Sequence, residues 1–347
     1  MNPARAHRAT ARDVADRAGV SVAMVSLVAN GKATGRATPE TEERVVQAIR
    51  ELDYRVNTTA SALARGALDT VAFVSPDPTS PFFSVVIEGI LEELDDNFAL
   101  TVLVPKVGDD YEASAVKRAL AGDLAGLILA SPGRTLLDGV NPSCPTVVLD
   151  SGETRDGMTS IDLDLSAAAV DIAEHLTGLG HRRLAYVGID RDKASLHVRR
   201  DALETQLSTR GASFAVDDLL VGRTTIVDAA AAFSAVWDDW DAAGITAVVC
   251  GDDLLAYGVL QVARERAIAI PSELSVLGFN DLPYSSLVSP ALTTVDLSAR
   301  ELGTRAAAAL TELISGAARP TTRSSGSSAT LNTRLIVRES TGPARSL

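Results

Sequence analysis

The sequence of 347 residues contains only two cysteines, and this scarcity excludes a fold held together by several disulfides. Cys144 and Cys250 each lie in an apolar segment with the composition of a strand. We therefore expect two buried free thiols in a reducing compartment rather than a disulfide or a metal site. His175 and His181 are six residues apart with no third ligand suitably placed, so we interpret both as structural.

Long apolar runs are also absent. No stretch of about 18 residues is free of charged side chains, so the sequence predicts no membrane span. The first 13 residues are basic but lack the apolar core of a signal peptide. We therefore expect a cytoplasmic protein with no membrane partner.

The chain lacks the common catalytic and nucleotide-binding motifs. It has no Gly-x-Ser-x-Gly and no Gly-x-Gly-x-x-Gly, and Gly31-Lys32 lacks the neighbours of a phosphate-binding loop. The pair Asp252-Asp253 fits helix capping better than acid–base chemistry. The sequence therefore predicts a protein that is not an enzyme and needs no cofactor.

Positive charge is scarce overall but unevenly distributed. The chain carries a net charge of −13. Residues 1–66 contain ten Lys/Arg and seven Asp/Glu, a net charge of +3, and the remaining residues carry −16. A basic head on an acidic body indicates that any contact with nucleic acid is confined to the head.

Residues 10–31 have the pattern of two short helices across a tight turn. Val14 and Ala18 share one face of the first helix. Gly19 can adopt the left-handed conformation that ends that helix, and Ser21 is a good N-cap for the next one. This is the outline of a helix-turn-helix, whose second helix enters the DNA major groove.

Many residues of this segment, and of the 30 or so that follow it, match one known pattern in fixed order. They are Asp13, Val14, Ala15, Ala18, Gly19, Val20, Ser21, Val25, Ser26, Asn30, Gly31, Thr41, Arg44, Val45, Ala48, Ile49, Leu52, Tyr54, Asn57, Ala60 and Leu63. In these residues the chain resembles the DNA-binding domain of the lac repressor (LacI/GalR) family. It departs from the family at Met24, Leu27, Ala29 and Val56, where Thr, Arg, Leu and Pro are usual.

The resemblance implies an all-α DNA-binding domain over residues 1–56 and a hinge helix over 57–66. In the family the hinge inserts a Leu into the minor groove, and Leu63 matches that position. On the residue pattern alone, a single Leu in a linker is an ordinary packing residue, and the resemblance favours the wedge. The implied DNA-binding residues are Thr10, Ser21, Val22, Ala23, Val25, Ser26, Asn30, Asn57, Ala60 and Leu63.

From residue 67 onward, continuous apolar segments alternate with helical ones. Such alternation predicts parallel sheets covered on both faces, and eight strands favour two doubly wound lobes with a ligand crevice between them. The expected strands are 71–75, 100–104, 124–130, 146–150, 184–189, 219–222, 247–252 and 274–279, with 292–297 and 330–340 completing the lobes.

This body, residues 67–347, resembles the periplasmic-binding-protein-like core of the same family. Its markers include Ser80-Pro81-Phe82-Phe83, Leu179-Gly180-His181 and Gly278-Phe279-Asn280-Asp281. For Asp253, position alone leaves helix capping and ligand contact equally open, and the resemblance favours ligand contact. The implied effector-binding residues are Ser80, Phe82, Phe83, Asp150, Arg199 and Asp253.

We therefore expect a transcriptional repressor that binds a pseudopalindromic double-stranded operator as a homodimer. A small molecule of the sugar or nucleoside class, bound between the lobes, would control operator affinity. Two alternatives are a solute-binding protein for transport, against which the DNA-binding motif argues, and a sugar or nucleoside hydrolase, which requires a metal or acid–base cluster. The effector, its sign of action and the operator sequence are not specified by the residues.

Overall fold

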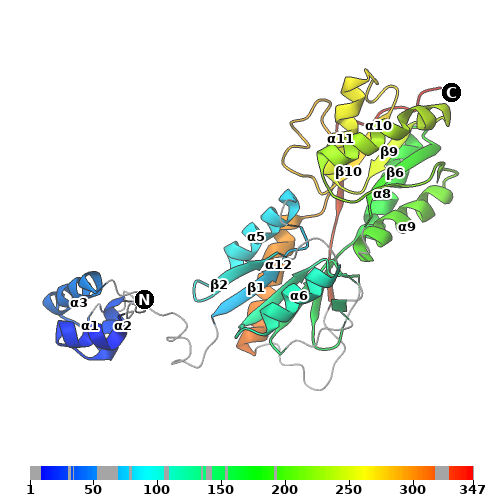
Figure 1. The fold of residues 1–347 in the computed structure, drawn as a ribbon. Helices are drawn as coiled ribbons and strands as arrows, with labels where there is room; N and C mark the ends of the chain where they lie inside the picture. The colour runs from blue at the N-terminus through cyan, green and yellow to red at the C-terminus, as the bar shows by residue number, and fades with distance from the viewer. Residues whose placement is uncertain are drawn as a thin grey trace, which may run out of the picture. The chain divides into compact units, whose positions relative to one another are not determined.

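The computed structural model describes residues 9–29, 33, 35–52, 69–77, 80–104, 109–133, 136–137, 143–152, 155–190, 194–316 and 328–346. The chain divides into two compact units, residues 1–68 and 69–347 (Figure 1). The predicted hinge helix lies outside the described residues, together with its Asn57, Ala60 and Leu63, and so does Asn30.

The described residues of the first unit form three helices: α1 (Ala11–Ala18), α2 (Val22–Ala29) and α3 (Pro39–Glu51). As predicted, Gly19 ends α1 in the left-handed conformation with φ of 67°. Thr38 caps α3 by accepting the Thr41 amide, and Pro39 is the first helical residue. The core of this unit consists of Val14, Ala15, Ala18, Val25, Val45 and Ala48.

The second unit has two α/β lobes. The sheet of the first lobe has the strand order β12-β5-β4-β3-β1-β2, and every pair in it is parallel. Its strands are β1 (Thr70–Val74), β2 (Ala99–Leu103), β3 (Gly126–Ala130), β4 (Thr146–Leu149), β5 (Thr159–Leu163) and β12 (Ser328–Leu331). The helices of this lobe within the described residues are α5 (Pro81–Glu93), α6 (Asp109–Leu120) and α12 (Ala299–Ser315).

The sheet of the second lobe has the order β13-β11-β10-β9-β6-β7, with β8 also paired to β6, and only the β11–β13 pair is antiparallel. Its strands are β6 (Arg183–Ile189), β7 (Ser213–Phe214), β8 (Leu219–Val221), β9 (Ala247–Cys250), β10 (Ser275–Phe279), β11 (Thr293–Asp296) and β13 (Arg334–Ile336). Its helices are α8 (Leu165–Gly178), α9 (Ala194–Ser208), α10 (Ile226–Ala242) and α11 (Asp253–Glu265).

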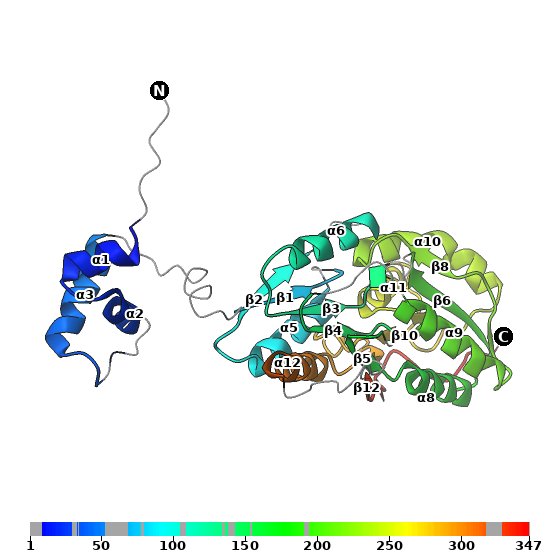
Figure 2. The ribbon, with the colours of Figure 1, turned by 90° about the horizontal axis from the view of Figure 1, so that it is seen from below.

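The C-terminal part of the chain returns to the first lobe, where α12 lies beside α5 (Figures 1 and 2). Two glycines permit this close approach. A Cβ on Gly89 would lie 2.1 Å from the Arg300 carbonyl oxygen, and one on Gly303 would lie 2.0 Å from that of Val86. A side chain at either position would separate the two helices.

Three connections between the lobes lie together. The chain crosses after β5, after β11 and between β12 and β13. At these crossings the Thr333 hydroxyl donates to the Asp164 carbonyl oxygen at 2.8 Å, and the Ser298 hydroxyl donates to that of Asn332 at 3.4 Å. The lobes are therefore joined along one edge, opposite which a ligand can enter.

Each predicted strand of the body overlaps a strand of the structure, and β5 and β7 were not predicted. β5 was missed because TSIDL is not a continuous apolar run, and β7 has only two residues. Among the described residues, Cys144 and Cys250 are free thiols. No helix in the described part of the chain is long and apolar enough to span a membrane.

Candidate functional site

The outward face of α2 is formed by small and apolar side chains. Ser21, Val22, Ala23 and Ser26 are all exposed, and Val22 retains 47% of its accessible surface. Side chains of this size allow the helix to approach a groove closely. They offer hydroxyl contacts to phosphates and apolar contacts to a thymine methyl group.

Two predicted DNA-binding residues also hold the helices in place. Thr10 forms a capping box with Asp13, because each side chain accepts a hydrogen bond from the other residue's backbone amide, at 2.7 and 3.3 Å. The Ser21 hydroxyl accepts the Met24 amide at 3.2 Å. These caps fix where α1 and α2 begin.

The inclusion of Val25 among the DNA-binding residues was wrong. Its side chain retains 1% of its accessible surface and belongs to the core of the three-helix unit. A residue at this position packs α2 against α1 and α3. From this buried position it holds in place the neighbouring side chains on the exposed face.

In the body, a cleft lies where strands of both lobes end. The first lobe contributes residues that follow β1, β3 and β4, and the second contributes residues that follow β6, β8, β9 and β10. This is the place where open parallel sheets bind ligands. The lining residues are Pro76, Asp77, Ser80, Phe82, Phe83, Ser131, Asp150, Ile189, Ser195, Leu196, Arg199, Thr224, Gly251, Asp252 and Asn280.

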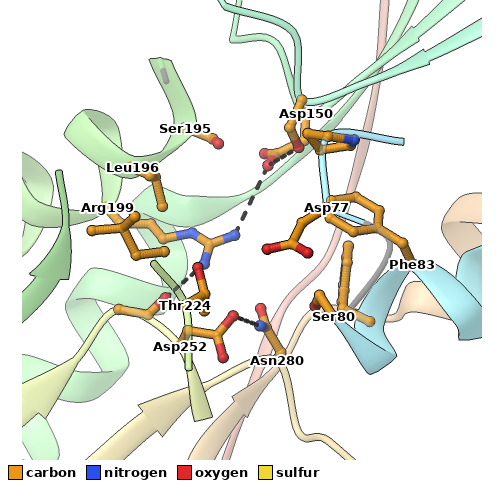
Figure 3. Close-up of a pocket in the computed structure, with 15 residues that line it drawn as sticks. Asp77, Ser80, Phe83, Asp150, Ser195, Leu196, Arg199, Thr224, Asp252 and Asn280 are labelled. Atoms are coloured by element: carbon orange, nitrogen blue, oxygen red, sulfur yellow. Dashed lines mark hydrogen bonds and ion pairs between the residues drawn. The ribbon is translucent and has the colours of Figure 1, made fainter. Parts of the chain in front are cut away.

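Arg199 from α9 is the central side chain of the cleft (Figure 3). It retains 6% of its accessible surface, and its guanidinium lies 5.2 Å from the centre of the Phe279 ring. One terminal nitrogen donates to the Gly251 carbonyl oxygen at 3.2 Å, and the other lies 3.9 Å from Asp150 Oδ2. Its Nε has no hydrogen-bond partner. A buried N–H without an acceptor is costly, so it favours a ligand oxygen at this point.

Asp150 follows β4 in the first lobe, so its ion pair with Arg199 crosses the cleft. It also accepts the Ser131 hydroxyl at 3.2 Å. Burial raises the pKa of Asp150, and the Arg199 charge acts against that shift. Ser131, Asp150 and Asn280 have φ values of 40°, 50° and 109°. Such strained backbone is typical of binding sites, where the surrounding fold imposes it.

Asp252 lines the second-lobe side of the cleft. Its extended backbone lets one carboxylate oxygen cap α11 by accepting the Leu254 amide at 2.8 Å. The other accepts the side-chain amide of Asn280, also at 2.8 Å. Burial raises the pKa of Asp252 to about 6.

The structure does not place Asp253 in the cleft. Its side chain is fully buried and accepts the Leu282 amide, the Ser285 hydroxyl and the Thr294 hydroxyl at 2.8, 2.7 and 2.6 Å. The prediction that Asp253 faces the effector cleft was therefore wrong, and the neighbouring Asp252 lines the cleft instead. Asp253 is the first residue of α11, and its side chain points toward the segment between β10 and β11. Its hydrogen bonds hold that segment in position.

The other predicted cleft residues Ser80, Phe82, Phe83, Asp150 and Arg199 lie together at the cleft. Ser80 precedes α5 without using its hydroxyl as a cap. Phe82 is mostly core and packs edge-on against Phe83 at 5.2 Å. Most of the lining residues that the sequence analysis missed come just after a strand end, which was the available signal, whereas Ile189 ends β6 and Ser195 and Leu196 lie in α9. The missed residues are Pro76, Asp77, Ser131, Ile189, Ser195, Leu196, Thr224, Gly251, Asp252 and Asn280.

The two histidines of interest bind the C-terminal segment. His175 Nε2 lies 2.8 Å from the Thr341 hydroxyl. His181 lies 2.9 Å from the Thr246 hydroxyl and 3.0 Å from the Gly342 carbonyl oxygen. Burial lowers the pKa of both rings. Within the described ranges, no group of three His, Cys, Asp or Glu side chains is placed to hold a metal ion.

Comparison with known proteins gives two family matches. Residues 10–57 match the model of bacterial regulatory proteins of the lacI family, and residues 173–341 match a periplasmic-binding-protein-like domain. The HTH-type transcriptional regulator GntR of Pseudomonas aeruginosa is 31% identical over 89% of this chain and 90% of its own length. Catabolite control protein A of Priestia megaterium is 27% identical over 87% of this chain and 92% of its own length.

Solved structures of transcriptional regulators have the same fold over nearly the whole chain. A lac repressor dimer bound to operator and the anti-inducer ONPF has a TM-score of 0.77 at 23% identity, covering 96% of this chain and 99% of its own. The complex of the regulator CelR with cellobiose has a TM-score of 0.66 at 26% identity, and the match covers 96% of this chain and 100% of the CelR chain. The transport and hydrolase alternatives find no support among these relatives, which are transcriptional regulators. The chain belongs to the LacI family, and it is a DNA-binding transcriptional regulator rather than an enzyme.

Proposed function

We propose that the chain is a cytoplasmic, homodimeric repressor whose operator affinity is controlled by a sugar or nucleoside bound in the cleft. The observation that carries the proposal is the Arg199 Nε, a buried donor without an acceptor in a cleft between two hinged lobes. A ring oxygen or hydroxyl of such an effector would accept this N–H. Hydroxyl groups would also donate to the surrounding carboxylates.

The DNA contacts would divide between α2 and the hinge. Ser21 and Ser26 suit phosphate or base-edge contacts, and Val22 and Ala23 suit thymine methyl groups. Asn57, Ala60 and Leu63 would form the hinge contacts, with Leu63 as a minor-groove wedge. The lac repressor dimer bound to operator supports this division by likeness of fold. A dimer would place two α2 helices in successive major grooves of a pseudopalindromic site.

The proposal is tested with DNA from upstream of the gene that encodes the chain, by fluorescence anisotropy at moderate salt with a panel of sugars and nucleosides. We expect sequence-selective binding that one panel member changes. In Arg199→Lys the effector should bind roughly 10- to 100-fold more weakly while operator affinity without effector is kept, because a charge-assisted hydrogen bond is lost.

Arg200→Lys is the matched control. Arg200 is the next residue of α9 but pairs with Asp218 at 2.7 Å and with Glu204, outside the cleft. Its substitution should leave the effector response unchanged. If Arg199→Lys and Arg200→Lys bind the effector equally well, Arg199 does not contact the effector. If the unsubstituted chain shows no sequence-selective DNA binding, the repressor function is contradicted.

A further inference from the structure

The helix α2 carries no charged side chain and no long polar one. Its residues are valine, alanine, methionine, serine and leucine alone, with neither an acid nor a base among them. None of the ten Lys/Arg in residues 1–66 lies between Arg17 and Lys32. The positive charge of the head, which attracts phosphates, therefore comes from residues outside α2.

This composition limits how α2 can distinguish one base pair from another. In the major groove, guanine is bound by the donors of Arg or Lys, adenine by the amide of Asn or Gln, and cytosine by a carboxylate. No residue from Val20 to Ala29 has such a group. The hydroxyls of Ser21 and Ser26 can donate or accept, so they suit either kind of base edge. The helix therefore lacks the hydrogen-bonding groups that specify a single base.

The exposed face of α2 offers apolar contact instead. Val22 retains 47% of its accessible surface and Ala23 is also exposed, whereas Val25 is buried in the core of the three-helix unit. Met24 and Leu27 are partly exposed. All four side chains that reach the surface end in methyl groups. The apolar group that a standard base pair presents in the major groove is the C5-methyl group of thymine.

We propose that α2, through Val22 and Ala23, recognises the C5-methyl groups of pyrimidines, those of thymine and equally those of 5-methylcytosine. The inference rests on the proposed function and specifies how the operator is recognised. 5-Methylcytosine carries its methyl group on the same ring carbon as thymine, and an apolar side chain does not read the neighbouring O4 or N4 atom. Methylation of a cytosine that α2 contacts therefore raises operator affinity.

The size of the effect follows from the apolar surface that one methyl group buries. Each buried methyl group changes the affinity about three- to fivefold. In a dimer on a pseudopalindromic site, both half-sites contribute the same free energy. A change made at equivalent positions of both half-sites should therefore alter the affinity about 10- to 25-fold.

The test begins by locating the operator, by footprinting DNA from upstream of the gene with the full chain. Synthetic duplexes then replace thymine by deoxyuridine, which lacks only the methyl group, at one pair of equivalent positions at a time. Fluorescence anisotropy at fixed salt measures the affinity. We expect a loss of about 10- to 25-fold at one or two positions in each half-site. With cytosine at those positions binding should also weaken, and 5-methylcytosine should bind about 10- to 25-fold more tightly than cytosine.

Val22→Ala shortens an exposed side chain without disturbing the core. We expect it to reduce the deoxyuridine penalty at least about threefold at the position that Val22 contacts. Val46→Ala is the matched control, because Val46 is also an exposed helical valine, with 37% of its surface accessible, but lies on α3. Its penalties should equal those of the unsubstituted chain.

Sequence-selective binding that tolerates deoxyuridine at every thymine would overturn this recognition and leave the proposed function intact. So would 5-methylcytosine that binds no better than cytosine where deoxyuridine weakens binding. Penalties that are equal in Val22→Ala and Val46→Ala would place the methyl contact outside this face of α2 and overturn the assignment. If the unsubstituted chain binds no DNA sequence selectively, the proposed function itself fails.

Discussion

Asp252 and Asp253 show how far neighbouring residues differ once the backbone direction changes between them. Asp252 keeps the extended conformation that follows β9, so its carboxylate reaches the cleft. Asp253 begins α11, and its carboxylate turns to the segment between β10 and β11. The sequence places both at a strand end but does not specify which of them faces the ligand.

The raised pKa of Asp253 makes its ionisation a determinant of stability. Burial raises that pKa to about 7, against 3.8 for an accessible aspartate. The folded state therefore binds the proton more tightly than the unfolded state. The contribution of Asp253 to the free energy of unfolding is full below about pH 4 and is lost as the pH rises through about 7. We expect Asp253→Asn to weaken the fall in stability between about pH 4 and pH 7.

Urea unfolding of the full chain at several pH values measures this effect. The variant and the unsubstituted chain share the buried His175 and His181, whose lowered pKa values act in the opposite direction. The difference between the two proteins therefore gives the contribution of Asp253 to the pH dependence of stability. Identical pH profiles would show that this carboxylate does not titrate in that range.

At the scale of single elements, predictability follows the strength of the local pattern. The strands β1, β3, β4, β9 and β10 are continuous apolar runs, and the sequence predicts each of them. The short β7 and the mixed TSIDL of β5 carry no such pattern, because tertiary pairing determines them. Most of the cleft residues that were missed lie on loops, whose course depends on tertiary packing and not on local sequence, and Ser195 and Leu196 lie in the first turn of α9.

The helix α2 offers a matched test of packing and recognition. Val25 is buried and Val22 is exposed, three residues apart on the same helix. We expect Val25→Ala to destabilise the three-helix unit by about 2 kcal/mol, through lost apolar burial and an unfilled cavity. Val22→Thr should leave that unit unchanged and alter which operator sequence is preferred.

Hydrogen exchange of α1 to α3 in the full chain reports the stability of the unit, and binding to operator variants reports recognition. Equal exchange in Val25→Ala and Val22→Thr would contradict the buried role of Val25. An unchanged sequence preference in Val22→Thr would remove that side chain from the recognition surface.

For the molecule as a whole, we expect exposed apolar side chains of the second lobe to take part in the dimer contact. Tyr284 and Leu287, between β10 and β11, retain 57% and 77% of their accessible surface, and Val227 at the start of α10 retains 73%. The Tyr257 hydroxyl, on α11, lies 2.8 Å from that of Ser285. A Cβ on Gly258 would lie 2.6 Å from the Ile226 carbonyl oxygen. These contacts place the three side chains on neighbouring segments.

We expect Leu287→Asp to shift the chain from dimer toward monomer and to weaken operator binding, because a charge would be buried without a partner in the interface. Sedimentation velocity measures the change. Leu220→Asp is the control, since Leu220 is exposed on β8, which pairs with β6 instead. A dimer that is as stable with Leu287→Asp as without it would exclude this surface.

The central claim is that effector binding in the cleft and operator binding by the head are coupled through the whole molecule. The direct test measures operator affinity with and without the sugar or nucleoside that binds, and the affinity for that effector with and without operator. Coupling requires both ratios to be equal, and we expect a factor of about 5 to 150. An effector that fills the cleft while leaving operator affinity unchanged would contradict the account.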